Sequence, residues 1–387
     1  MGIVKNSIIS TSFGFLTQFL SFIVMPILIQ NVGDFEFGRY SSLISLVFIA
    51  IPLTSFRIEF TFFDESKKGD KDIVSTLYVL IFITSLFLSF CHLFFVRSVE
   101  DAIKFFTLLL TMSIFLVNSQ YFIYKNQFLL VGFLRFFEIS LFFLLGFLIE
   151  LIYSRTISLF MVSILPIFLL FKNGDIDIRK IIKENIDFIR YLTPGHLLNG
   201  FCRELPTLLI GAKFGLEVGG YFFLMTRLFR VPVTILANGL GDVIRRDFQG
   251  SIFQYNFKKA IFFSLILSFT GFTILGILSE YILEDLFRLD YSKYHAFVIP
   301  LAISSSFQTV SNIYGNIYIV LGMQKTDFFW QLSSFIFLIL WVIYIQYTSD
   351  IVVVANSICL CWSISHVLNI ILITKCHENS DYNRLSQ

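Results

Sequence analysis

Charged residues inside otherwise apolar segments are the positions in this sequence where chemistry is expected. Arg203 and Glu204 interrupt one such segment. Arg227 and Arg230 interrupt the next at a spacing of i and i+3, which places both on one face of a helix. Arg57 lies near the end of an earlier segment, where its long side chain can reach the membrane surface. A charge near the centre of a bilayer costs about 2.5–3.5 kcal/mol, so the central ones should face a protein interior or a watery cavity.

Arginine at these positions favours the binding of an anion. A guanidinium group donates two parallel hydrogen bonds to phosphate oxygens, so a cavity lined by arginines can replace the water around a diphosphate group. We therefore expect four residues to bind substrate, namely Arg203, Arg227, Arg230 and Arg57. The alternative is a structural network in which Arg203, Arg227 and Glu204 neutralise one another between two helices.

Carboxylates within the apolar segments are the second kind of candidate. Glu204 and Asp242 can take up and release protons if they lie away from water, which makes them the candidate ion-coupling groups. Asp242 is close to the end of its segment, where ordinary solvation is the alternative. Arg135 and Glu138, at i and i+3 in another segment, are expected to pair with each other within the membrane.

Patterns typical of catalysis, metal binding and nucleotide hydrolysis are missing from the sequence. The 5 histidines and 5 cysteines form neither an HExxH motif nor a paired CxxC spacing. No GxxxxGK[ST] loop is present, so ATP hydrolysis is not expected. We expect no enzymatic activity, no metal and no cofactor, with a proton or sodium gradient as the energy source.

Apolar segments fill most of the chain. Of its 387 residues, 56% are hydrophobic and 14% are charged, whereas a soluble domain carries about 25% charged residues. Runs of roughly 20 apolar residues are long enough to cross a bilayer as helices. We predict an all-α integral membrane protein with about twelve transmembrane helices. Their predicted positions are 6–33, 40–62, 73–96, 105–124, 128–152, 156–171, 191–214, 219–243, 260–279, 296–321, 328–349 and 351–374.

Lysine and arginine concentrate in the loops on one side of these segments. By the positive-inside rule, this distribution predicts that both termini are cytoplasmic. The loop 172–190 carries isoleucines at helical spacing, which predicts either an amphipathic helix on the membrane surface or an extension of the seventh span. The predicted organisation is a six-helix lobe at 1–172, a cytoplasmic linker at 173–190, a second six-helix lobe at 191–374 and a cytoplasmic tail at 375–387.

The two predicted lobes share a short pattern. A proline, an ExGxY motif and a second proline occur in the same order in both, at Pro26, 36–40 and Pro52 and again at Pro206, 217–221 and Pro232. Each copy spans the turn between the first two helices of a lobe, where glycine permits a tight reversal. The pattern predicts parallel repeats related by an axis along the membrane normal. The prolines are expected either to act as hinges or to be ordinary kinks.

Three stretches resemble the polysaccharide biosynthesis (oligosaccharide flippase) family, which includes the Wzx O-antigen flippases, within the multidrug/oligosaccharidyl-lipid/polysaccharide exporter (MOP) superfamily. They are FGFLTQFLSFIVMPILIQNVGDFEFGRY at 13–40, LPTLLIGAKFGLEVGGYFFLMTRLFRVPVTILANGL at 205–240 and IYGNIYIVLGMQ at 313–324. The resemblance implies two six-helix lobes around a central cavity that opens alternately to either side. It also implies a flippase that moves a polyprenyl-diphosphate-linked oligosaccharide from the inner to the outer leaflet of the bacterial inner membrane.

The partners implied by this resemblance are an undecaprenyl-diphosphate-linked oligosaccharide, membrane lipids, and the polymerase and chain-length proteins of the same pathway. No nucleic-acid partner is expected, since the net charge is only +2. One alternative is an exporter of a drug or small metabolite in the same superfamily, for which an apolar, acidic cavity is expected in place of the arginines. A membrane polymerase of lipid-linked sugars is a weaker alternative, because it needs a long external loop that the sequence lacks.

Overall fold

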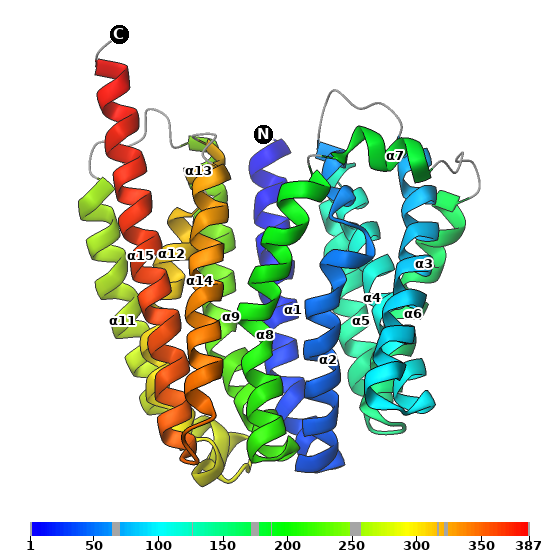
Figure 1. The fold of residues 1–387 in the computed structure, drawn as a ribbon, viewed down its shortest axis with the longest axis horizontal. Coiled ribbons are helices and arrows are strands. Elements are labelled where there is room, and N and C mark those ends of the chain that lie inside the picture. The colour runs from blue at the N-terminus through cyan, green and yellow to red at the C-terminus, as the bar shows by residue number, and fades with distance from the viewer. Residues whose placement is uncertain are drawn as a thin grey trace. The chain divides into compact units, whose positions relative to one another are not determined.

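The computed structural model is built from helices (Figure 1). It describes residues 2–63, 70–125, 127–171, 178–186, 188–247, 257–315, 317–320 and 324–385, and within these ranges it contains no strand. The helices pack into two compact units, Met1–Gly220 and Tyr221–Gln387. We refer to them as unit 1 and unit 2.

Unit 1 holds the helices of the first half of the chain. Its elements are α1 (Gly2–Val32), α2 (Asp34–Thr54), η1 (Ile58–Phe63), α3 (Asp70–Val96), α4 (Val99–Tyr124), α5 (Phe128–Gly146), α6 (Leu151–Phe171), α7 (Ile178–Glu184), η2 (Phe188–Leu192), α8 (Thr193–Phe214) and the start of α9 (Leu216–Asp247). Within it α2 packs along α8, α1 along α5, and α3 along α4.

Unit 2 holds the rest of α9 and the helices that follow it. Its further elements are α11 (Phe257–Tyr281), η3 (Ile282–Leu286), η4 (Tyr291–Lys293), α12 (His295–Tyr314), α13 (Ile317–Val320), α14 (Gln324–Ile345) and α15 (Ile351–Leu385). Here α12 packs between α11 and α15, and α14 packs along α15.

Membrane-spanning length and composition are present in 10 of the described helices. A further helix, α6, has a shorter apolar stretch at Leu151–Ile164. The helix α8 is long enough but carries the charges of Arg203 and Glu204. With α6 and α8, the predicted set of about twelve spanning helices is accounted for, so the predicted all-α membrane fold is confirmed.

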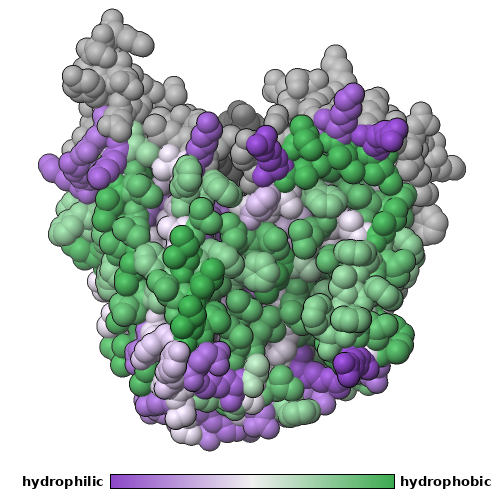
Figure 2. Space-filling model, in the orientation of Figure 1, coloured by the Kyte–Doolittle hydropathy of each residue, from purple (hydrophilic) through white to green (hydrophobic). Residues whose placement is uncertain are grey.

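The outward faces of the helices are apolar. Phe87 and Phe90 of α3 and Phe263 and Leu267 of α11 all point away from the cores of their units. Figure 2 shows apolar side chains covering the middle of the helices, with hydrophilic side chains near the helix ends. Such a distribution suits contact with lipid tails along the helices and with water at their ends.

The loop after α6 contributes to the core of unit 1. Ile181 of α7 is buried against a cluster that includes Leu77 and Ile81 of α3, and Figure 1 shows α7 beside the end of α3. The helix that the isoleucine spacing predicts therefore exists as a separate short element. The π-helical turn η2 leads from the residues after α7 directly into α8, so an extension of the seventh span is present as well.

A single glycine makes each of two helix connections. Gly33 joins α1 to α2 with φ 87°, and Gly215 joins α8 to α9 with φ 105°. Positive φ values of this kind are readily adopted only by glycine. The two connections belong to the two copies of the repeated pattern, so the repeat in sequence corresponds to a repeat in local structure.

The division into units does not fall at the predicted linker, because α8 packs along α2 in unit 1. The predicted lobes at 1–172 and 191–374 rest on the repeat and stay a prediction.

Candidate anion-binding site

Close packing of α8 on α2 positions the candidate site. Gly200 of α8 lies on the backbone of α2 at Ile49, where a Cβ atom on the glycine would be 3.4 Å from the Ile49 Cα. Further along, Gly211 of α8 faces Gly219 at the start of α9. Glycine allows the two backbones to approach this closely, and the approach brings side chains of α2 and α8 into contact.

Glu204 lies at the α2–α8 contact and is almost completely buried, with 2% of its side chain exposed. Its Oε1 accepts a hydrogen bond from Nε of Arg203 at 2.7 Å, and its Oε2 accepts one from the Ser45 hydroxyl of α2 at 3.2 Å. A buried carboxylate is stable as an anion only with a cation and hydrogen-bond donors beside it. The pair of Arg203 and Glu204 is one part of the structural network given above as the alternative, and its third member, Arg227, lies in unit 2.

Arg203 uses only part of its guanidinium group for this pair. Its side chain is 38% exposed, and its Cζ lies 5.4 Å from the centre of the Phe48 ring. Among the residues that the structure describes, its two Nη atoms have no protein acceptor. An arginine fixed through Nε, with both Nη atoms available, is arranged to bind two oxygens of an anion.

Arg57 lies just beyond the end of α2 rather than inside a span, which corrects the predicted helix at 40–62. The helix ends at Thr54, and Phe56 and Arg57 then have φ values of 50° and 58°. These left-handed conformations are costly for residues with side chains and are held here by tertiary contacts. One such contact is the hydrogen bond from the Thr193 hydroxyl of α8 to the Phe56 carbonyl, at 2.8 Å.

The guanidinium of Arg57 pairs with a fully buried carboxylate. Its Nη1 lies 3.2 Å from Oε1 of Glu59, a residue with no exposed surface. Burial lowers the pKa of Arg57, whereas Glu59 acts in the opposite direction.

Phe60 connects Arg57 to α8. The Arg57 Cζ lies 5.6 Å from the centre of its ring, and the His196 ring stacks on it at 5.7 Å. His196 is also within electrostatic reach of both Arg57 and Arg203. The site thus contains two guanidinium groups and an imidazole, and each guanidinium is paired with a buried carboxylate. Sequence reasoning missed His196 and Phe60, whose only signal is that they flank the predicted charges.

The other predicted site residues belong to α9. Arg227 and Arg230 lie in unit 2, and the Cζ of Arg227 is 4.8 Å from the centre of the Phe223 ring. Their predicted role in binding substrate stays a prediction. Asp242 lies within α9, but its side chain is outside the described residues.

The predicted pair of Arg135 and Glu138 is wrong. Glu138 of α5 instead pairs with Arg155 of α6, whose Nη1 lies 2.8 Å from Oε1, and it also accepts a hydrogen bond from the Ser158 hydroxyl at 3.1 Å. Within the described part of the chain, Arg135 forms no ion pair. The reason is that α6 packs on α5 and brings a second helix to Glu138.

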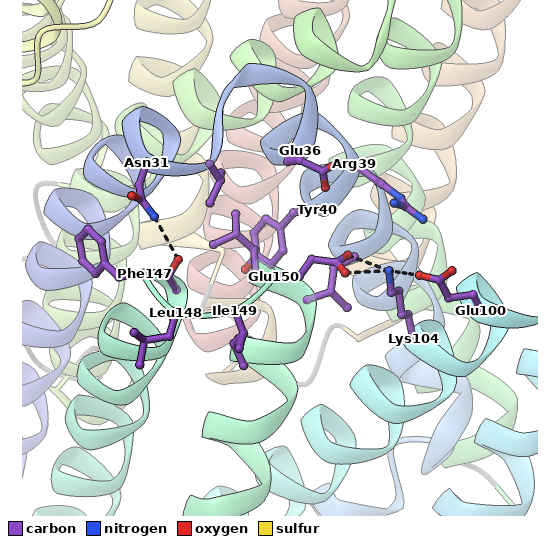
Figure 3. A pocket seen from close by; sticks show the side chains of 14 residues that line it. Asn31, Glu36, Arg39, Tyr40, Glu100, Lys104, Phe147, Leu148, Ile149 and Glu150 are labelled. Atoms are coloured by element: carbon purple, nitrogen blue, oxygen red, sulfur yellow. Dashed lines mark hydrogen bonds and ion pairs between the residues drawn. The ribbon is translucent and has the colours of Figure 1, made fainter.

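A pocket of about 450 Å³ opens in unit 1 beside the turn from α1 to α2 (Figure 3). Lys104 of α4 is fully buried in its wall, with Nζ 2.6 Å from Glu100 and 2.8 Å from Glu150. Arg39 of α2 pairs with Asp101 at 2.8 Å. These ion pairs join the ends of α2, α4 and α6. Because both cations in this pocket are already paired with carboxylates, Arg203 remains the better candidate for binding an anion.

Comparison with known proteins identifies the fold. No protein-family model and no curated protein sequence matches the chain. One similar solved structure is an outward-facing multidrug resistance MATE family transporter of the MOP superfamily, with a TM-score of 0.67 and 13% identity over 98% of this chain and 96% of that one. Another is a ligand complex of the MATE multidrug transporter DinF-BH, with a TM-score of 0.68 and 14% identity over 97% and 95%.

A third similar structure is a MOP superfamily transporter from Pyrococcus furiosus Vc1, described as having a binding pocket of reverse polarity that suggests a different function. It has a TM-score of 0.64 and 16% identity over 97% of this chain and 95% of that one. These identities are low, so the likeness shows the fold. The chain has the fold of these transporters along almost its whole length, which confirms the predicted fold.

Proposed function

We propose that this chain is a secondary exporter that moves a small amphiphilic organic substrate across a membrane by alternating access. The observation that carries this proposal is the likeness of nearly the whole chain to structures described as multidrug transporters. An exporter requires no catalytic residues, and its long apolar helices suit a substrate that partitions into lipid.

The substrate of this exporter carries an anionic group. The side chain of Arg203 is 38% exposed and its Nη atoms have no acceptor among the described residues, while Glu204 and Glu59 are buried. An anion approaching α2 and α8 therefore meets guanidinium groups before it meets carboxylates. In this proposal a proton or sodium gradient drives export, both termini are cytoplasmic, and Arg227 and Arg230 of α9 also contact the substrate.

A second candidate function is the flipping of a polyprenyl-diphosphate-linked oligosaccharide across the bacterial inner membrane. The same arginines favour it, because a diphosphate is an anion that guanidinium groups bind well. The three stretches that resemble oligosaccharide flippases point the same way. In this case the partners would be the lipid-linked sugar and the polymerase and chain-length proteins that use it.

Purified protein in liposomes can separate these functions. Three fluorescent amphiphiles of matched size, one anionic, one cationic and one neutral, are tested for gradient-dependent transport, together with a labelled short-chain polyprenyl-diphosphate sugar. We expect transport of the anionic amphiphile, which stops when an ionophore collapses the gradient. Movement of the polyprenyl-diphosphate sugar alone would support the second candidate. If a monodisperse protein moves none of the four probes, both proposals are wrong.

A further inference from the structure

A chain of polar side chains crosses the interior of unit 2 and ends at His366. The Tyr318 hydroxyl donates to Oδ1 of Asn369 at 2.8 Å, and Nδ2 of Asn369 donates to the Ser311 hydroxyl at 2.7 Å. The same hydroxyl lies 3.1 Å from Nδ1 of His366. These residues come from α13, α15 and α12, so the chain of hydrogen bonds joins three helices.

The direction of these hydrogen bonds depends on the protonation of His366. Asn369 already donates to Ser311, and within the described residues the only acceptor for the Ser311 hydrogen is Nδ1 of His366. We assign the tautomer with Nδ1 unprotonated, because it gives the buried Ser311 hydrogen an acceptor; the ring is then neutral with its hydrogen on Nε2.

Protonation of His366 would reverse the direction of the hydrogen bonds between His366, Ser311 and Asn369. A charged ring donates from Nδ1 to Ser311, which can then donate to the amide oxygen of Asn369 if that amide turns over. The amide nitrogen would then donate to the hydroxyl oxygen of Tyr318. All four residues stay connected in this second arrangement, but the hydrogen of the Tyr318 hydroxyl loses its acceptor on Asn369 and has to turn to another one.

The surroundings of His366 are polar but contain no direct counter-charge. Tyr318, Asn369 and Ser311 are each at most 2% exposed. On the α14 side, Trp330 lies 6.0 Å from the His366 ring, and no carboxylate among the described residues contacts His366.

The nearest titratable groups lie beside Tyr318, at the end of the network away from His366. Asp327 of α14 accepts a hydrogen bond from Gln331 and interacts electrostatically with Tyr318, as does Cys376 of α15. On α12, the Tyr314 hydroxyl is engaged with Ser264 of α11. Asp327 therefore lies near Tyr318, at the end of these hydrogen bonds that is opposite to His366.

We propose that His366 is a proton-binding site and that its protonation reverses the hydrogen bonds joining α12 to α13 and α15. The two arrangements differ in the acceptor of the Tyr318 hydrogen, so protonation of His366 changes the free energy of the contact between α13 and α15. Such a site would couple a proton gradient to movement of the helices. This last step rests on the proposed function, whereas proton binding itself does not.

The proton site can be tested without any transport measurement. Protein with ¹⁵N-labelled histidine is reconstituted in lipid nanodiscs and titrated by NMR from pH 8 to pH 4, and His366 is assigned by the signal lost in His366→Gln. We expect hydrogen on Nε2 alone at pH 8, protonation of Nδ1 within the range, and a shift of the midpoint by about one pH unit in Ser311→Ala. Neutral His366 throughout, a protonated Nδ1 at pH 8, or an unchanged midpoint in Ser311→Ala would each overturn the proposal.

Transport then tests the coupling step. We expect His366→Gln to reduce the dependence of export on the pH gradient by about tenfold. His295→Gln is the control, since His295 is an exposed histidine at the opposite end of α12, beside the local Ser292 carbonyl and the Tyr291 ring. Gradient dependence that is unchanged in His366→Gln would overturn the coupling role. If the wild-type chain exports nothing, the proposed function fails, and the NMR titration still decides the proton site.

Discussion

Gly38 of α2 and Gly220 at the start of α9 pack backbone against backbone. A Cβ atom on Gly220 would lie 3.1 Å from the Gly38 Cα, and a Cβ atom on Gly38 would overlap the backbone carbonyl of Leu216. Gly38 is the glycine of the first ExGxY motif, and Gly220 directly follows the glycine of the second. The two copies of the repeated pattern therefore meet each other in space, which gives a structural reason for the glycines in both.

Adding a methyl group at this contact should separate the two helices. We expect Gly38→Ala to lower the free energy of unfolding by about 1–3 kcal/mol, because a backbone carbonyl cannot move aside as a side chain can. Thermal unfolding in detergent measures the effect. Gly271→Ala in α11 is the matched control, since nothing lies within 4 Å of a Cβ atom there. Equal melting temperatures for the two variants would contradict the close contact.

The pair formed by Glu138 and Arg155 predicts an asymmetry between two arginines. Arg155→Met leaves a buried carboxylate without its cation, which should destabilise the protein by about 3–5 kcal/mol. Arg135→Met, three residues from Glu138 on the same helix, should have a much smaller effect. Chemical unfolding of both variants provides the comparison, and a larger loss in Arg135→Met would restore the pairing that the sequence predicts.

Arg57 and Glu59 should be coupled in stability. We expect Arg57→Met to destabilise the protein by about 3–5 kcal/mol, because Glu59 is then buried without a partner. The double variant Arg57→Met/Glu59→Gln should recover most of this loss, since the buried charge is then absent. A double-mutant cycle on the free energy of unfolding measures the coupling. Additive effects of the two changes would show that the pair contributes nothing.

Much of the fold follows from apolar length. The spans are visible in sequence because a bilayer requires runs of roughly 20 apolar residues. The turns at Gly33 and Gly215 are also predictable, since glycine near a repeated motif indicates a tight reversal. The end of α2 is not predictable in this way, because the run of apolar residues continues past Thr54 while the backbone at Phe56 and Arg57 has already left the helix.

The candidate site follows from sequence only in part. Charges in mid-span identify Arg203 and Glu204, because their cost in a membrane is independent of the fold. The partners of those charges depend on which helices pack together, and spacing along one helix does not contain that information. Ser45 meets Glu204 because α2 lies on α8, and Arg155 reaches Glu138 because α6 lies on α5.

Transport by an Arg203 variant tests the central claim most directly. Initial export rates of the anionic and neutral amphiphiles are measured in liposomes for wild type, Arg203→Gln and the control Lys213→Gln, whose lysine is exposed near the end of the same helix. We predict that Arg203→Gln slows export of the anionic probe by about tenfold to a hundredfold, the loss expected for charge-assisted hydrogen bonds, and leaves any export of the neutral probe unchanged. Wild-type rates for the anionic probe in Arg203→Gln, at equal protein content, would contradict the anion-binding site.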